Sequence, residues 1–261
     1  MHITIINDCK DANVVGRQLA RVASLLNTNA TFVGISNELE ASGNIIDILD
    51  ASQESEGIIL VNVAPRNGKA KQHSNGTPFG YFWHKKILIV SSVDGLTLSL
   101  VKKLKITEHI NVLNIPKSLD VLIEKGALKY NLKDHITNSQ FRSYEFLPRI
   151  GAFIFKHQNI ESEKMDIANI ADAPAAIWWI DNFGNCKTTI FAEELGLKNK
   201  DIIKTKAGKL TYYTRLKDVP NALSAIITGS SGLGEKRFLE IVIQGKSAEK
   251  KYRLHSGDIV F

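Results

Sequence analysis

The feature that most constrains the fold is a change of pattern along the chain. In the first half, short apolar runs alternate with amphipathic stretches, which is typical of βαβ units. Strands are expected at residues 3–6, 31–35, 57–63, 87–91 and 110–115. Apolar residues at helical spacing, such as Val15, Leu19 and Val22, predict helices at residues 15–26, 39–49, 96–104 and 146–155. Because strands joined by helices run parallel, the pattern predicts an α/β domain with a mainly parallel sheet.

The pattern changes after a polar stretch. Short strand-like runs separated by turn residues then cover residues 177–180, 188–191, 201–206, 209–216, 223–227, 238–244 and 258–261. Such spacing predicts a smaller all-β domain, a barrel or a sandwich. We therefore expect an α/β domain over residues 1–157, a linker over 158–174 and a β-barrel-like domain over 175–261.

Composition narrows the function classes. The net charge of +6 invites a nucleic-acid partner, but the Lys and Arg residues are scattered, so nucleic-acid binding is kept only as a minor alternative. No apolar run approaches the length of a membrane span, and the first residues lack a secretory signal pattern, so a cytoplasmic protein is expected. Cys9 and Cys186 are expected to be free thiols, although one bridge stays open. His and Cys spacing predicts no metal site.

Three loops follow the carboxyl ends of expected strands, where parallel sheets bind their ligands. They cover residues 7–13, 64–86 and 92–95. Asp8 could accept hydrogen bonds from the vicinal hydroxyls of a ribose. It could equally be the N-cap of the next helix, a role open to Asp11 or Asn13 as well. The long loop 64–86 is expected to be functional or mobile.

Two further segments could form a site. Residues 178–185 combine two tryptophans with Asp181, Phe183 and Asn185, which offer a stacking face, a charge and an amide. The same residues could instead be a packed strand that ends in a turn. The Gly- and Ser-rich segment 229–234 is expected to be a turn, and a P-loop is excluded because no helix follows it.

In this order, the segments resemble the S-adenosyl-L-methionine (SAM) hydroxide adenosyltransferases and their relatives, the SAM-dependent fluorinases and chlorinases. The family signature Asp-x-Phe-Gly-Asn-x-x-Thr-Asn-Ile corresponds to Asp-Asn-Phe-Gly-Asn-Cys-Lys-Thr-Thr-Ile at residues 181–190. The opening Asp motif corresponds to residues 8–11. The later Ser-rich turn, Leu-Glu-Ile strand and Ser-Ala pair correspond to residues 230–232, 239–241 and 247–248. The similarity covers nearly the whole chain.

The resemblance implies a homotrimer whose sites lie between the N-terminal domain of one subunit and the C-terminal domain of its neighbour. It implies SAM or adenosine as the ligand, no separate cofactor, and an Asp8 carboxylate that holds the ribose hydroxyls. The substrate-binding residues that it implies are Asp8, Asp94, Asp181, Phe183, Asn185, Ser230 and Ser231.

The resemblance also implies a reaction, the hydrolysis of SAM to adenosine and methionine by attack of water at C5′. The Asp, Arg and His that handle water in the family correspond here to Ala64, Lys71 and Phe141, and Ser143 and Tyr144 replace an Arg-Asp pair. Two outcomes stay open: a SAM hydrolase, or a catalytically silent SAM- or adenosine-binding protein that acts as a sensor or sequestering module. A replacement site could be formed by His73, His84 and Asp94.

Overall fold

The computed structural model describes residues 1–53, 55–64, 77–157 and 160–261. The chain forms two compact units. The first comprises Met1–Ile45 and Ser52–Ala171, and the second comprises Ile46–Ala51 and Asp172–Phe261. The domain bounds expected from the sequence stay a prediction.

The first unit is built on a seven-stranded sheet with the order β2-β1-β3-β5-β4-β6-β7. Four strands are parallel to one another: β1 (His2–Asn7), β2 (Thr31–Gly34), β3 (Gly57–Asn62) and β5 (Ile87–Ser92). The others join by antiparallel pairing: β4 (Phe79–His84), β6 (His109–Leu113) and β7 (Glu163–Asp166). The sheet is therefore mixed, and the expectation of a mainly parallel sheet is not confirmed.

The difference arises at β4, which lies inside the stretch expected to be a loop. Two residues, Lys85 and Lys86, join β4 to β5, and Lys85 has a positive φ of 54°. So short a connection forces its two strands to be antiparallel, since a parallel pair needs a long crossover. His84 consequently pairs with Ile87, at the amino end of β5.

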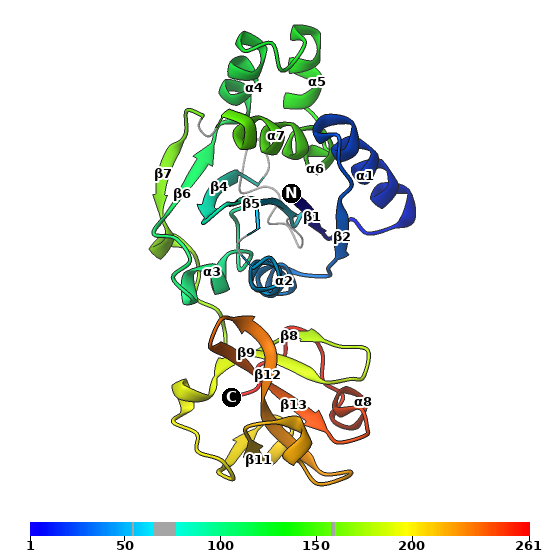
Figure 1. Ribbon diagram of the computed structural model, residues 1–261, viewed down its shortest axis with the longest axis vertical. Helices are drawn as coiled ribbons and strands as arrows, with labels where there is room; N and C mark the ends of the chain where they lie inside the picture. Colours follow the sequence, from blue (N-terminus) through cyan, green and yellow to red (C-terminus); the bar gives the residue numbers. More distant parts are fainter. Residues whose placement is uncertain (54, 65–76, 158–159) are drawn as a thin grey trace. The chain divides into compact units, whose positions relative to one another are not determined.

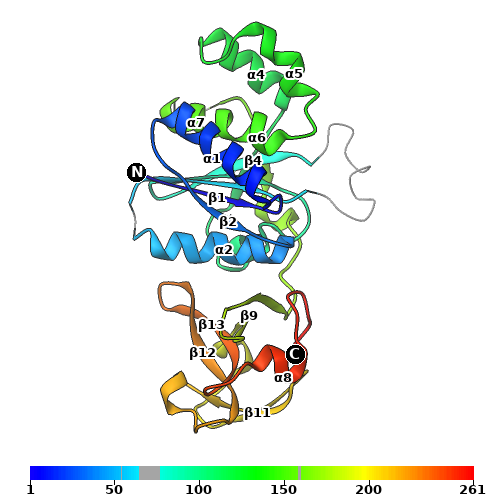
Figure 2. The ribbon, with the colours of Figure 1, turned by 90° about the vertical axis from the view of Figure 1, so that its right-hand side faces the viewer.

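Helices cover both faces of this sheet (Figures 1 and 2). On one face lie α1 (Ala12–Leu26), α6 (Arg142–Glu145) and α7 (Leu147–His157); α3 (Ser99–Lys103) and the start of α2 (Glu38–Ala51) lie on the other. A Cβ atom at Gly151 would stand 2.8 Å from Leu60, so glycine lets α7 approach β3 closely. The helices α4 (Ile115–Glu124) and α5 (Lys133–Thr137) extend beyond α7 (Figure 1). Within the described ranges, no helix has the length and apolar character to cross a membrane.

The second unit contains a six-stranded sheet with the order β10-β11-β12-β13-β9-β8. Its strands are β8 (Ile177–Ile180), β9 (Cys186–Phe191), β10 (Ile202–Thr205), β11 (Gly208–Tyr213), β12 (Ser224–Leu233) and β13 (Lys236–Ile243), and α8 (Ala248–Tyr252) follows them. Among the described residues the sheet stays open between β10 and β8, which corrects the barrel-like expectation. Residues 258–261, expected to be a strand, form only an isolated bridge between Ala176 and Ile259.

The segment 229–234 also differs from expectation. It belongs mostly to β12, where the pairing with β13 is irregular between Thr228 and Gly232. Gly232 has a φ of 136° and faces the backbone oxygen of Lys236, a position that excludes any side chain. The pairing with β13 therefore overrides the local preference of Gly and Ser for a turn.

Candidate functional site

The connection between β8 and β9 is a turn that Asp181 holds closed. Its Oδ1 atom accepts hydrogen bonds from the backbone N–H groups of Phe183 and Asn185, both at 2.9 Å. Its Oδ2 atom accepts a third from Nδ2 of Asn185 at 2.9 Å. The packed strand that ends in a turn is present, and the Asp181 carboxylate holds that turn. The ligand-binding role of Asp181, Phe183 and Asn185 stays a prediction.

Gly184 docks the turn onto the start of α8. It has a φ of 81°, and a Cβ atom there would lie 2.1 Å from Oγ of Ser247. Ser247 is the N-cap of α8 and accepts a hydrogen bond from the N–H of Lys250 at 3.0 Å. The N–H of Glu249 donates to the carbonyl of Gly184 at 3.0 Å. Glycine is thus required by both the backbone conformation and the close approach.

This turn borders a pocket of about 510 Å³, formed entirely by the second unit. Its lining comes from three separate segments: Phe183, Asn185, Leu216, Ile243, Gln244, Gly245, Lys246 and Ser247. The volume falls within the range of roughly 300–1,000 Å³ that is usual for small-molecule sites. Sequence reasoning identified Phe183 and Asn185, but the other lining residues are distant along the chain and were missed.

The pocket combines apolar surface with a few polar groups. Phe183 is 71% exposed and Leu216 is 38% exposed, so both present apolar faces to an entering ligand. Asn185 donates through Nδ2 to Asp181, and within the described residues its Oδ1 atom has no partner. An aromatic face beside an amide oxygen can bind a planar base that carries an amino group.

Ser230 and Ser231 lie on β12 and do not line this pocket. Oγ of Ser231 accepts a hydrogen bond from Nζ of Lys187 at 2.6 Å. The ammonium of Lys187 also stands 5.7 Å from the ring centroid of the buried Trp178. Lys187 is a polar group that the sequence interpretation did not single out. The ligand-binding role of the two serines stays a prediction.

In the first unit, Asp8 follows β1 at the carboxyl edge of the parallel strands. Its Oδ2 atom accepts a hydrogen bond from the N–H of Ala64, just after β3, at 3.1 Å. The N-cap of α1 is Asp11, whose side chain accepts from the N–H groups of Asn13 and Val14, both at 3.1 Å. The helix-cap alternative for Asp8 is therefore wrong, and its ribose-binding role stays a prediction.

Asp94 lies beyond the carboxyl end of β5, at the same edge as Asp8, and its Oδ1 atom accepts from the N–H of Gly95 at 2.9 Å. His84 lies at the opposite edge, because it pairs with Ile87 at the start of β5. Six strand residues separate the two edges, about 20 Å at the usual rise per residue. A site that joins His84 to Asp94 is therefore wrong, and His73 lies outside the described residues.

Two of the three positions that correspond to the family's water-handling residues are described. Ala64 contributes its backbone N–H to Asp8. Phe141 precedes α6, and its ring stacks on that of Tyr144 with centroids 5.4 Å apart and an interplanar angle of 22°. A methyl group and a phenyl ring cannot take a proton from water. Lys71 lies outside the described residues.

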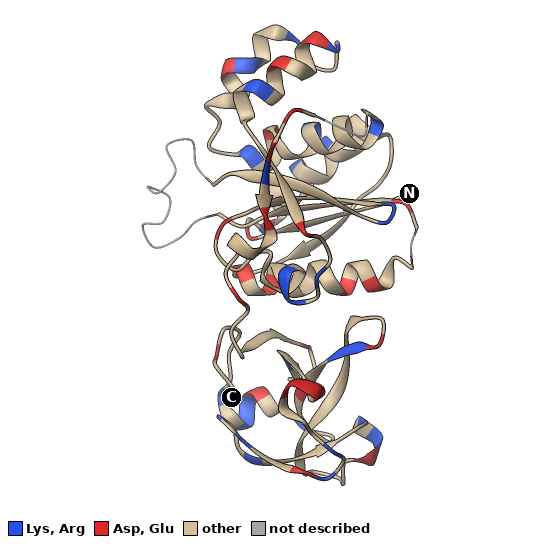
Figure 3. Cartoon of the chain, turned by 90° about the vertical axis from the view of Figure 1, so that its left-hand side faces the viewer, with Lys and Arg blue, Asp and Glu red and all other residues tan. Residues whose placement is uncertain are grey.

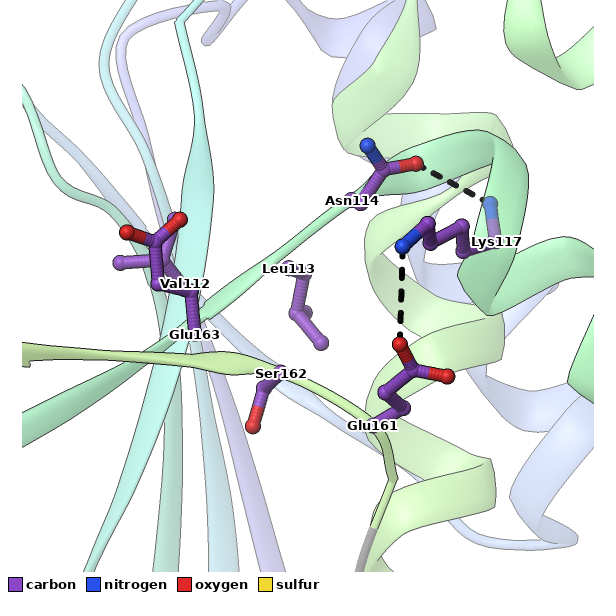
Figure 4. Close-up of a pocket in the computed structure, with 7 residues that line it drawn as sticks. All are labelled: Val112, Leu113, Asn114, Lys117, Glu161, Ser162 and Glu163. Carbon is purple, nitrogen blue, oxygen red and sulfur yellow. Dashed lines mark hydrogen bonds and ion pairs between the residues drawn. The ribbon is translucent and has the colours of Figure 1, made fainter.

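Another cavity, of about 390 Å³, opens in the first unit between the end of β6, the start of α4 and the residues before β7 (Figure 4). Asn114 caps α4 there, and the exposed pair Lys117 and Glu161 approach to 3.5 Å at its rim. None of the residues predicted from the sequence lines it. The described residues also contain no group of three or more His, Cys, Asp or Glu side chains that could hold a metal ion.

The charges of the described residues are mixed rather than grouped by sign. Segments that carry Lys or Arg alternate with segments that carry Asp or Glu in both units (Figure 3). A nucleic-acid interface usually presents a basic patch or stripe on one face. The distribution therefore gives no support to the minor alternative of a nucleic-acid-binding module.

Both cysteines are free thiols, as expected. Burial raises the pKa of the Cys186 thiol to about 12, so it is scarcely ionised at neutral pH. Because the thiolate is the reactive form, we expect Cys186 to resist a thiol reagent in the folded protein and to react after denaturation. Counting labelled thiols with and without urea, with Cys9→Ser to remove the second signal, checks this. Equal labelling rates in both states would contradict the burial of Cys186.

Comparisons with known proteins find one family model that matches most of the second unit. Residues 175–261 match the model of the SAM hydroxide adenosyltransferase C-terminal domain. No curated protein matches the chain. The fold is similar to that of an uncharacterized conserved protein from Thermotoga maritima, with 15% identity, a TM-score of 0.69 and coverage of 99% of this chain and 98% of that chain. It is also similar to a conserved hypothetical protein from Thermus thermophilus, with 15% identity, a TM-score of 0.54 and coverage of 98% of this chain and 97% of that chain.

At such identity the two solved structures show the fold alone. The family match bears on the candidate site as well as on the fold, because residues 175–261 contain the whole lining of the 510 Å³ pocket and the turn that Asp181 closes. It supports SAM binding at the level of the family. Residues 175–261 of the chain are therefore similar to the C-terminal domain of the SAM hydroxide adenosyltransferases.

Proposed function

We propose that this chain binds SAM or a related adenosine compound, and that the pocket of the second unit receives the adenosine part. The observation that carries the proposal is the position of that pocket, which lies wholly within the residues that match the SAM hydroxide adenosyltransferase C-terminal domain. Adenine would stack on the exposed ring of Phe183. Its amino group would donate to Oδ1 of Asn185, an atom that the turn leaves available.

We propose further that Asp8, in the first unit, binds the ribose of the same ligand. A carboxylate can accept hydrogen bonds from both hydroxyls of a ribose, and Asp8 stands at the sheet edge where such ligands bind. The family resemblance implies a homotrimer in which Asp8 of one subunit and Phe183 of a neighbour serve the same ligand. Asp94, Ser230 and Ser231 are further candidates on the same ground. Asp181 serves by holding Phe183 and Asn185 in place.

Calorimetric titration with SAM and with adenosine tests the binding proposal. A base stacked on an aromatic side chain contributes about 1–3 kcal/mol, so Phe183→Ala should raise the Kd for the adenosine compound about tenfold. Tyr130→Ala is the matched control, because Tyr130 is 79% exposed and lies in the first unit. Its Kd should equal that of the unchanged protein.

Two results would overturn the proposal. One is the absence of binding heat with both SAM and adenosine. The other is an equal Kd for Phe183→Ala and the unchanged protein. That result would show that the ligand binds outside this pocket.

The reaction is a separate question. In the hydrolase, water attacks C5′ of SAM, the bond from C5′ to sulfur breaks, and adenosine, methionine and a proton are formed. A specific observation favours the silent binding protein as the second candidate: Ala64 and the stacked ring of Phe141 stand at water-handling positions. Chromatography after a long incubation with SAM separates the two, with Asp8→Ala as the control. Equal amounts of adenosine and methionine identify the hydrolase, and unchanged SAM with intact binding identifies the silent protein.

A further inference from the structure

A cluster of arginines and aromatic rings lies where α1 packs against α6. Arg17 and Arg21 are four residues apart on α1, so they share one face of that helix. The guanidinium carbon Cζ of Arg17 stands 4.6 Å from the ring centroid of Tyr144 and 5.2 Å from that of Phe141. Cζ of Arg21 stands 4.3 Å from the Tyr144 centroid. Two cations therefore meet the same ring.

The cluster carries more positive than negative charge. Oε2 of the buried Glu145 lies 3.5 Å from Nη1 of Arg21 and 3.0 Å from Nη1 of Arg149. Arg21 also donates from Nη2 to the hydroxyl of Tyr144 at 2.6 Å. One carboxylate is thus shared by two guanidinium groups. Arg17 adds a third positive charge, and like charges four residues apart on a helix repel each other.

The environment keeps this charge from being fully hydrated. Arg142, the first residue of α6, packs with its Cζ 5.4 Å from the ring of Phe79, and burial lowers the pKa of its guanidinium. The paired Arg21 and Arg149 are largely buried as well. In surroundings of reduced dielectric, an excess of positive charge attracts an anion more strongly than it would in water.

Arg17 is the group in the cluster that can meet such an anion. It is exposed, and its contacts with described residues are the two ring contacts, which use the flat face of the guanidinium. The N–H groups at its edge form no hydrogen bond with the described residues. A guanidinium whose plane is fixed by stacking loses little freedom when it forms two parallel hydrogen bonds to a carboxylate or phosphate group.

We infer that Arg17, aided by the field of Arg21, binds an oxyanion at the surface of α1 and α6, namely the phosphate or carboxylate group of a small molecule. This site differs from the proposed SAM pocket, although Phe141 of the cluster corresponds by the family resemblance to a water-handling position. All of its residues belong to the first unit, and none of them lines the pocket of the second.

An NMR titration that follows the arginine Nε–Hε signals tests the inference, with inorganic phosphate in one arm and sodium acetate in the other at constant ionic strength. The Arg17 signal should shift and saturate with at least one anion, and the arm that saturates identifies the oxyanion class. Because hydrogen bonds to charged groups are the strong ones, Arg17→Gln should weaken the apparent affinity about tenfold. Arg17→Lys, which keeps the charge but loses the fork, should fall between the two proteins.

Arg215→Gln is the matched control, because it removes one exposed arginine charge from the second unit and should leave the anion affinity unchanged. If Arg17→Gln does not fold, the anion affinity of Arg17→Lys still tests the inference. An Arg17 shift that rises linearly with the anion concentration and does not saturate would overturn the inference. So would the same affinity in the unchanged protein and in either Arg17 variant, because Arg17 would then only pack α1 against α6.

Discussion

Gly184→Ala is expected to destabilise the second unit by about 3 kcal/mol or more, since a strained backbone and an overpacked methyl group each cost roughly 1–3 kcal/mol. The backbone has a φ of 81°, and the new methyl group would meet Oγ of Ser247 at 2.1 Å and its backbone Cα at 3.0 Å. The turn would have to leave α8, which would also displace Phe183 from the pocket. Urea unfolding followed by tryptophan fluorescence measures the loss, because Trp178 and Trp179 lie in the strand before the turn.

Gly196→Ala is the control that separates the cost of the steric contact with Ser247 from the cost of backbone strain. Gly196 has a φ of 60° in the same unit, and nothing lies within 4 Å of the position that its Cβ would take. This control should cost only the backbone strain, about 1 kcal/mol. If the two variants lose the same stability, the close approach of Gly184 to Ser247 is not real.

Asp181→Ala should have the second large effect, a loss of roughly 2–4 kcal/mol, because three groups lose a charged acceptor at once. They are the N–H groups of Phe183 and Asn185 and the Nδ2 group of Asn185. The affinity for SAM should fall as well, even if the carboxylate never touches the ligand, because Phe183 and Asn185 would no longer be held. Urea unfolding and calorimetric titration measure the two effects.

Asp181→Asn refines this test. Its amide oxygen can still accept from the backbone of the turn, but its NH₂ group would face another donor, Nδ2 of Asn185. We expect an intermediate loss of stability. Asp201→Ala is the control, since the Asp201 carboxylate accepts a single turn hydrogen bond, from the N–H of Lys198 at 2.7 Å. An Asp181→Ala loss no larger than that of Asp201→Ala would show that the carboxylate does not hold the turn.

The strands that the sequence predicted well are those with local signals. The strands β3 and β5 contain continuous apolar runs, β1 contains three Ile residues, and α1 shows its helical period directly. The strand β7 has the sequence Glu-Lys-Met-Asp and no apolar signal, so its conformation depends on pairing with β6. The strand β12 likewise continues through Gly and Ser because β13 pairs with it. In both cases the pairing with another strand decides the conformation, and the residue types within the segment itself do not reveal that pairing.

The residues of the candidate site were likewise predicted only in part from the sequence. Asp181, Phe183 and Asn185 lie within one short turn, and their residue types alone indicated a possible stacking face and amide. Leu216 and Gln244 reach the same pocket from other segments, so only the fold reveals them. One signal was available for another lining residue: Ser247 belongs to the Ser-Ala pair at residues 247–248, which resembles a family motif.

The strand β7 has a consequence for how copies of the chain can meet. It is the last strand of the first sheet, and Glu163, Lys164 and Asp166 on it are exposed. Charged side chains on an edge strand discourage the addition of another strand, and so protect a sheet from growing into aggregates. Self-association by continuing the sheet at β7 is therefore disfavoured, and an assembly of several copies has to form through other surfaces.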